Sequence, residues 1–272
     1  HTVTTKPSRP LRQVTRGKTA PNRLRKTDAF LALAFPEFTR HLPGVYVDLG
    51  YGAYPITSVE TLARLRRLNA DLRVVGVEID PARVAAAESS RRPGLDFRFG
   101  GFNLPLGPGE TAAVVRAFNV LRQYSEAEVA AALEALAIGM CPLGLLIEGT
   151  SNPTGQLMTF NLFQKIDDRL APLGLVLAPG LRRDFSPRQL QPVLPKNFIH
   201  HAAPDGLIDT FFATWTRAWS AARAHGNDLR QIFAASAGRL REAGYAIDPR
   251  PALLRRGFLW LKPPWPMRDE VH

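Results

Sequence analysis

The chain has 272 residues, of which 45% are hydrophobic, and its formal net charge is +11. This length and apolar content are enough to bury one large core. No apolar run approaches the roughly 20 residues that cross a bilayer, and a single cysteine excludes an internal disulfide framework. We therefore expect a cytoplasmic protein with no membrane partner.

The positive charge is concentrated at the start of the chain. The first 26 residues carry eight basic side chains and no acid, whereas residues 27–272 carry 27 basic and 24 acidic side chains, a net +3. Because Pro7, Pro10 and Gly17 interrupt it, we expect residues 1–18 to form a flexible basic leader. Two roles remain open for this leader: salt-dependent contact with RNA phosphates, or a solubilising tail.

The sequence after the leader alternates between helical and strand patterns. A first helix is expected over residues 22–42, with an interruption at Pro36. Ser125 and Glu128 match a capping box, and Asp80 before Pro81 matches a helix N-cap. Residues 142–144, Pro-Leu-Gly, predict a turn before the fifth strand. Strands are expected at 45–49, 73–78, 97–99, 112–118 and 145–148, and further helices at 56–69, 80–89 and 125–138.

Alternation of this kind predicts an α/β fold, a doubly wound and mostly parallel Rossmann-like sheet with helices on both faces. After residue 150 we expect strands at 157–164 and 175–177 as an antiparallel edge, helices at 208–224 and 229–243, and a last strand at 257–261. No linker demands a second domain, so residues 19–272 are expected to form a single domain. The proline-rich segment 186–206 is a candidate cap over the pocket.

The segment Asp48-Leu49-Gly50-Tyr51-Gly52 links the first strand to the following helix. Glycines at such a turn let a ligand approach the main chain closely. The second strand ends at Glu78, where a carboxylate can accept hydrogen bonds from the two hydroxyls of a ribose. These features predict a site for a nucleoside-bearing cofactor.

The details of the turn favour one cofactor over others. A dinucleotide fingerprint needs a third glycine at the position that Pro55 occupies, and the phosphate-binding loop ending in Gly-Lys-Ser/Thr is absent. Asp48, at the end of its strand, suits a positive charge such as a sulfonium or an amino group. S-adenosylmethionine therefore fits this turn better than NAD, FAD or ATP.

Four motifs, residues 47–52, 75–80, 99–103 and 116–122, follow in order over about residues 45–150. On these residues the chain resembles the class I S-adenosylmethionine-dependent methyltransferases, and residues 16–25 resemble the lead-in of a bacterial subgroup whose members mostly lack an assigned substrate. Tyr54 replaces a third glycine of the family, and the acidic residue after the third strand is missing. The resemblance implies that the cofactor is held by Asp48, Gly50, Tyr51, Gly52, Glu78, Ile79, Gly101, Phe102, Asn103 and Asn119.

Methyl transfer chiefly requires that donor, acceptor atom and sulfur be held in line. Candidates on the acceptor side follow the fourth strand: Asn119, Arg122 and Tyr124. Asn119 can instead stabilise the strand end, and Arg122 with Tyr124 can be a surface or packing pair. No His, Cys or carboxylate cluster has a metal-ligand spacing, so we expect no metal.

Three functions remain open on the sequence. The first is a methyltransferase acting on RNA or another anionic acceptor, indicated by the basic leader. The second is a methyltransferase acting on a small molecule. The third is a non-catalytic nucleic-acid-binding module that retains the fold. The acceptor and the oligomeric state are not specified by the sequence.

Overall fold

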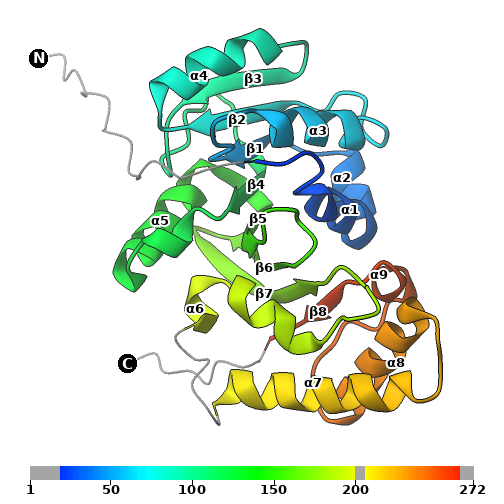
Figure 1. The fold of residues 1–272 in the computed structure, drawn as a ribbon. Coiled ribbons are helices and arrows are strands. Elements are labelled where there is room, and N and C mark those ends of the chain that lie inside the picture. The colour runs from blue at the N-terminus through cyan, green and yellow to red at the C-terminus, as the bar shows by residue number, and fades with distance from the viewer. Residues whose placement is uncertain (1–18, 200–205, 264–272) are drawn as a thin grey trace, which may run out of the picture.

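A computed structural model of the chain describes residues 19–199 and 206–263 (Figure 1). The expected basic leader, residues 1–18, therefore lies outside the described residues. So do residues 200–205, which fall within the expected cap segment. The division into leader, single domain and cap stays a prediction.

One eight-stranded mixed sheet forms the centre of the molecule, with the strand order β3-β2-β1-β4-β5-β6-β7-β8. β1 to β5 are parallel, and β6, β7 and β8 are antiparallel to their neighbours. This confirms the predicted Rossmann-like fold class with an antiparallel edge. In chain order the strands are β1 (Val45–Leu49), β2 (Val74–Glu78), β3 (Leu95–Phe99), β4 (Ala112–Phe118), β5 (Met140–Ser151), β6 (Met158–Ile166), β7 (Arg169–Ala178) and β8 (Leu259–Leu261).

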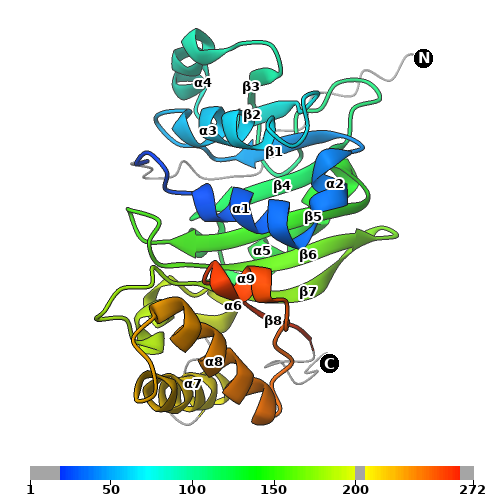
Figure 2. The ribbon, with the colours of Figure 1, turned by 90° about the vertical axis from the view of Figure 1, so that its right-hand side faces the viewer.

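Helices cover both faces of the sheet (Figures 1 and 2). Apolar side chains of α1 (Arg25–Ala34), α3 (Ile56–Leu65), α4 (Pro81–Ala87) and α9 (Pro251–Arg255) pack on one face. On the other face, α5 (Glu126–Gly139) packs on the parallel strands, and η3 (Pro187–Val193), α7 (Leu207–Arg223) and α8 (Leu229–Glu242) pack near β7 and β8. The remaining elements are α2 (Pro36–Arg40), η1 (Glu88–Ser90), η2 (Leu121–Gln123) and α6 (Lys196–Ile199).

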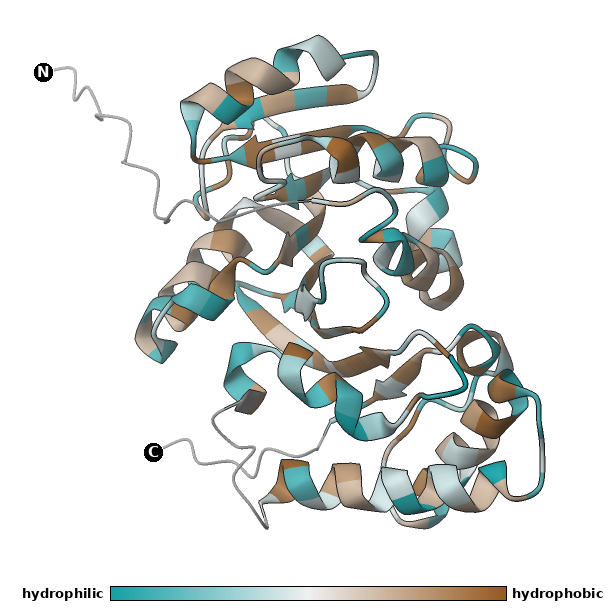
Figure 3. Cartoon of the chain, viewed as in Figure 1, coloured by the Kyte–Doolittle hydropathy of each residue, from teal (hydrophilic) through white to brown (hydrophobic). Residues whose placement is uncertain are grey.

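Local sequence explains how these elements begin and pack. The Asp80 side chain accepts a hydrogen bond from the Ala82 amide at the start of α4, and Ser125 and Glu128 form the predicted capping box of α5. Every residue of β4 is buried, as expected for a central parallel strand covered on both faces. Along α7, hydrophilic and hydrophobic residues alternate in bands, as in an amphipathic helix (Figure 3).

The turn predicted at residues 142–144 is wrong. β5 begins at Met140, directly after α5 ends at Gly139, and runs through the Pro-Leu-Gly segment. Leu143 has a φ of 61°, and the pairing with β4 shifts register between Ala112 and Val114. The irregular residues are therefore absorbed as a distortion within a strand, which residue preferences alone cannot distinguish from a turn.

The strands end together at one edge of the sheet, which positions the site. Ser151 at the end of β5 pairs with Met158, Met158 pairs with Ala178 at the end of β7, and Leu177 pairs with Leu259. The turn between β5 and β6, residues 152–157, therefore lies at the same edge as the glycine turn after β1. Ligands of open parallel sheets bind outside this edge.

Candidate functional site

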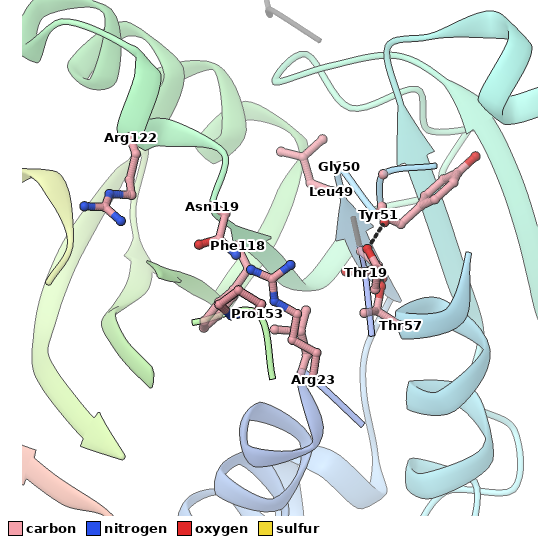
Figure 4. Close-up of a pocket in the computed structure, with 13 residues that line it drawn as sticks. Thr19, Arg23, Leu49, Gly50, Tyr51, Thr57, Phe118, Asn119, Arg122 and Pro153 are labelled. Atoms are coloured by element: carbon pink, nitrogen blue, oxygen red, sulfur yellow. Dashed lines mark hydrogen bonds between the residues drawn. The ribbon is translucent and has the colours of Figure 1, made fainter. Parts of the chain in front are cut away.

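A cavity of about 430 Å³ lies at the carboxyl ends of β1 and β4 (Figure 4). Its wall combines the turn after β1, the segment after β4, the start of the described chain and the β5–β6 turn. The lining residues are Thr19, Arg23, Leu24, Asp48, Leu49, Gly50, Tyr51, Gly52, Thr57, Phe118, Asn119, Arg122 and Pro153. The predicted glycine turn and Asn119 thus border the same cavity.

The glycine turn has the backbone conformation that its sequence predicts. Gly50 and Gly52 have φ values of 75° and 87°, which L side chains adopt only with strain. The Tyr51 carbonyl between them accepts a hydrogen bond from the Thr19 hydroxyl at 3.2 Å. The Tyr51 ring points away from Asn119 (Figure 4) and packs edge-on against Phe97, with 5.5 Å between ring centroids. The main chain of Tyr51 rather than its ring is therefore what faces a ligand.

Asp48 lines the cavity, but its carboxylate already has partners on both oxygens. Oδ2 accepts hydrogen bonds from the hydroxyls of Thr57 and Ser58, each at 2.7 Å, and Oδ1 accepts one from Arg116 Nε at 3.0 Å. Thr57 and Ser58 belong to the first turn of α3. Asp48 therefore ties the start of α3 to the end of β1, and its negative charge is matched by Arg116.

Arg116 is fully buried in β4 and donates to groups from three elements. Its Nη1 donates to Asp28 at 3.0 Å and to Thr61 at 2.8 Å. Burial alone lowers the pKa of Arg116, but the carboxylates of Asp48 and Asp28 raise it overall, so the guanidinium stays charged. Sequence analysis missed this residue as part of the site, although an arginine inside the apolar strand 112–118 was the available signal.

Glu78 is fully buried at the end of β2 and holds the glycine turn. One oxygen accepts a hydrogen bond from the Gly52 amide at 3.0 Å, and the other accepts one from the Ile79 amide at 2.8 Å. Arg83 lies 3.7 Å from the same carboxylate. The structure therefore brings Glu78, Ile79 and Gly52 together beside the cavity, while the predicted ribose contact stays a prediction.

The three predicted residues after β3 differ in their surroundings. Gly101 and Phe102 are buried, whereas Asn103 is exposed. Phe102 packs edge-on against Tyr124, with 5.5 Å between ring centroids. None of them is among the residues that line the 430 Å³ cavity. Their predicted contact with an adenine stays a prediction.

The candidates after β4 divide into two kinds. Asn119 has a φ of 57°, a conformation that asparagine tolerates better than most residues, and its Oδ1 accepts a hydrogen bond from the Ser151 amide at 3.2 Å. Arg122 lines the cavity and donates to the Pro192 carbonyl of η3 at 3.1 Å. Tyr124 is buried against Phe102 and does not line the cavity. Asn119 and Arg122 thus line the cavity, whereas Tyr124 does not.

The start of the described chain supplies a wall that the sequence did not reveal. Arg23 Nε donates to the Ser151 hydroxyl at 3.0 Å, and its guanidinium points toward Asn119 (Figure 4). The carbonyl oxygen of Arg23 lies 1.9 Å from where a Cβ on Gly155 would be, so only glycine fits there. Gly155 also has a φ of 68°. These contacts fix residues 19–24 against the β5–β6 turn.

Ile147 of β5 pairs with Arg116, and its side chain packs on the same face of the sheet, against α1 and α3. Because successive side chains of a strand point to opposite faces, the next residue, Glu148, lies on the other face. Glu148 is buried and accepts a hydrogen bond from the side-chain amide of Asn161 at 2.9 Å. Burial raises the pKa of Glu148 to about 7, while the bond from Asn161 acts in the opposite direction. This carboxyl group changes its charge near neutral pH.

Within the described ranges, no group of three or more His, Cys, Asp or Glu side chains is arranged to hold a metal ion. In the same residues no helix combines the length and apolar character needed to cross a membrane.

The fold and this cavity define an α/β protein of the Rossmann-like class with a cavity at the carboxyl edge of its sheet. No family model matches the chain, and no curated protein matches it. Solved methyltransferase structures are similar to it over part of their length. One is human N-acetylserotonin methyltransferase in complex with SAM, at 19% identity and a TM-score of 0.34, covering 46% of this chain and 34% of that one.

Two further solved structures show the same level of similarity. An amino pentose methyltransferase from Micromonospora echinaspora, bound to SAM, is 18% identical with a TM-score of 0.35, covering 60% of this chain and 78% of that one. Magnesium protoporphyrin IX methyltransferase from Synechocystis PCC 6803, with bound SAH, is 22% identical with a TM-score of 0.34, covering 46% and 53%. The chain thus spans about a third of the human protein and about half of the Synechocystis one. At these values the similarity does not bear on function.

Proposed function

We propose that the protein is an S-adenosylmethionine-dependent methyltransferase whose cofactor occupies the cavity beside the glycine turn. The observation that carries this proposal is the connection between Glu78 and Gly52. A buried carboxylate at the end of β2 accepts a hydrogen bond from the amide of a positive-φ glycine in the turn after β1, beside a 430 Å³ cavity. This arrangement suits a ligand with a ribose at one end and an amino acid at the other.

In this proposal, different residues contact the ribose, methionine and adenine parts of the cofactor. Each Glu78 oxygen accepts one backbone amide and has a second acceptor position, through which Glu78 accepts hydrogen bonds from the ribose hydroxyls in this proposal. The main chain of Gly50, Tyr51 and Gly52 faces the methionine portion. Phe102 and Asn103 are assigned to the adenine end. Asp48 affects cofactor binding by holding the glycine turn in position and not by an ion pair with the cofactor. Its oxygens already accept hydrogen bonds from Arg116, Thr57 and Ser58.

The bound cofactor supplies a methyl group on a positively charged sulfur, which is a good leaving group. The protein then has to orient an acceptor atom in line with that methyl group and keep water away. Asn119 and Arg122, at the end of β4, are the residues that we assign to the acceptor side. Both line the cavity, and Asn119 is fixed by its bond to the Ser151 amide.

Titration calorimetry with S-adenosylmethionine and S-adenosylhomocysteine tests the proposal. We expect the wild-type protein to bind both and Gly52→Ala to bind at least about tenfold more weakly, because a side chain there strains and obstructs the turn.

Gly109→Ala is the matched control. Gly109 also has a positive φ, 73°, but a Cβ there would meet no heavy atom within 4 Å, and it does not line the cavity. We expect its affinity to equal that of the wild type. Absence of binding heat and of a thermal shift in the wild-type protein contradicts the proposed function.

A further inference from the structure

Two pairs of arginines extend the carboxyl edge of the sheet beyond the cavity. Arg182 and Arg183 follow β7, whereas Arg255 is the last residue of α9 and Arg256 follows it before β8. Because Leu177 near the end of β7 pairs with Leu259 at the start of β8, both pairs lie at the edge that holds the cavity.

The two pairs are neighbours in space. Leu181, which precedes Arg182, has its Cδ1 3.5 Å from where a Cβ on Gly257 would be, and the Pro179 carbonyl oxygen lies 3.7 Å from the same point. Figures 1 and 2 show the loop after β7 beside α9. We call these four arginines the arginine rim.

The rim has a local excess of positive charge. All four side chains are exposed, and in residues 19–199 and 206–263 they form no side-chain hydrogen bond or ion pair. The nearest acid in the sequence is Asp184. Several other arginines are paired with carboxylates: Arg98 with Asp96 and Glu110, Arg188 with Asp209 and Arg250 with Asp248.

Basic residues also lie at the end of β7 and in the cavity wall. Lys26 donates to the Ala178 carbonyl at the end of β7 at 2.8 Å, and Arg23 and Arg122 line the cavity itself. Thr19 is also part of the cavity wall. The sequence that precedes Thr19 carries five basic residues and no acid.

We propose that the carboxyl edge binds the phosphodiester backbone of a nucleic-acid strand, with the arginine rim contacting phosphates that flank the nucleotide at the cavity. Guanidinium groups match phosphate oxygens in a two-pronged geometry. An acidic protein partner fits less well, because protein interfaces need an apolar or aromatic centre. Among the described residues, the exposed large apolar side chains are Tyr54, Leu68, Phe99, Ile138, Leu143, Ile166 and Leu207, and none belongs to the rim loops.

The identification of that strand as the methyl acceptor rests on the proposed function, whereas strand binding does not. The two claims can therefore be tested on the same variants of the full chain. R182E/R183E and R255E/R256E each reverse two rim charges. R67E/R92E is the matched control, since Arg67 and Arg92 are also exposed but lie beyond the amino ends of the parallel strands.

Fluorescence anisotropy with a labelled single-stranded RNA, the same DNA sequence and polyglutamate measures binding over a series of salt concentrations. We expect each rim variant to bind RNA at least about tenfold more weakly and to lower the salt slope by about 1.4, because two phosphate contacts to a single strand are lost. We expect R67E/R92E to bind like the wild type. Equal affinity for DNA leaves the inference in place and identifies the backbone, without the 2′-hydroxyl, as the recognised group.

Three outcomes overturn the inference: wild-type RNA affinity in both rim variants, an equal loss in the control, or equal binding of polyglutamate. Calorimetry with S-adenosylmethionine separates the two proposals. Rim variants that keep cofactor affinity while losing RNA show that the surface is distinct from the cofactor site. A wild-type protein that binds RNA through the rim but not the cofactor contradicts the proposed function alone.

Discussion

The guanidinium of Arg116 lies between the carboxylates of Asp28 and Asp48, 3.0 Å from each. All three side chains are almost completely buried. Asp28 belongs to α1, Arg116 to β4 and Asp48 to the end of β1, so one cation joins a helix of one face to two central strands. Arg64 of α3 adds a second ion pair to Asp28 at 2.9 Å. The floor of the cavity is therefore supported by a buried charge network.

Replacing Arg116 by Met should destabilise the fold by about 3–5 kcal/mol, because two carboxylates then remain buried with one cationic partner fewer. Urea denaturation followed by circular dichroism measures the change. Arg67→Met, an exposed substitution of the same type, should change the free energy of unfolding by less than about 0.5 kcal/mol. A loss of less than about 1 kcal/mol for Arg116→Met would show that the network relaxes easily.

Asp48→Ala should weaken S-adenosylmethionine binding by more than about tenfold, roughly 1.4 kcal/mol. If Asp48 acts through the turn, Ser58→Ala should also weaken binding, although Ser58 does not line the cavity. Ser89→Ala is the control, because the Ser89 hydroxyl bonds only the Ala86 carbonyl on the exposed side of α4. Calorimetry distinguishes an indirect effect of Asp48 through the turn from a direct contact with the ligand. Unchanged affinity in Ser58→Ala favours the direct contact.

Glu78→Ala should also weaken cofactor binding by more than about tenfold, because it removes both the proposed ribose acceptor and the acceptor of the Gly52 amide. Glu88→Ala is the comparison, since Glu88 pairs with Arg91 on the surface. The dissociation constants come from the same calorimetric titration. Wild-type affinity in Glu78→Ala would contradict the role of Glu78 in cofactor binding, on which the proposed function depends.

Glu148 should make the protein less stable as pH rises from about 4.5 to about 7. The ordinary pKa of the carboxyl group is 4.5 and burial raises it to about 7, so the folded state binds the proton more tightly than the unfolded state. The stability that this proton contributes is present below pH 4.5 and lost as pH rises through 7, on the order of 3 kcal/mol.

Glu148→Gln removes this titration and keeps the size of the side chain. The free energy of unfolding of the wild type relative to Glu148→Gln should therefore fall between pH 4.5 and pH 8. Urea denaturation at a series of pH values measures it. Parallel pH profiles for the two proteins contradict a raised pKa at this position.

Local sequence signals were sufficient for most of the fold and for the glycine turn. The capping box at Ser125, the N-cap at Asp80 and the buried β4 all depend on neighbouring residues, and all three are present in the structure. The start of β5 could not be recognised, because its Pro-Leu-Gly segment has the composition of a turn and lies between Met140 and Leu145, where the pairing with β4 shifts register.

The charge network and the cavity wall depend on contacts between distant residues. Arg116 meets Asp28 across 88 positions of sequence, and Arg23 meets Ser151 across 128. No spacing rule connects such residues, so the sequence could indicate the carboxylates and glycines of the site but not which of them were already paired. The position of Asp48 was predictable, and its neutralisation by Arg116 was not.

The contact between Arg23 and Gly155 also determines when the cavity becomes complete during synthesis of the chain. Residues 19–24 are synthesised before the β5–β6 hairpin that holds them in place, which follows more than a hundred residues later. A nascent chain that ends at β4 contains the residues of the glycine turn but lacks the β5–β6 turn, which completes the wall of the cavity. The cavity therefore gains its last wall only after that hairpin has been synthesised.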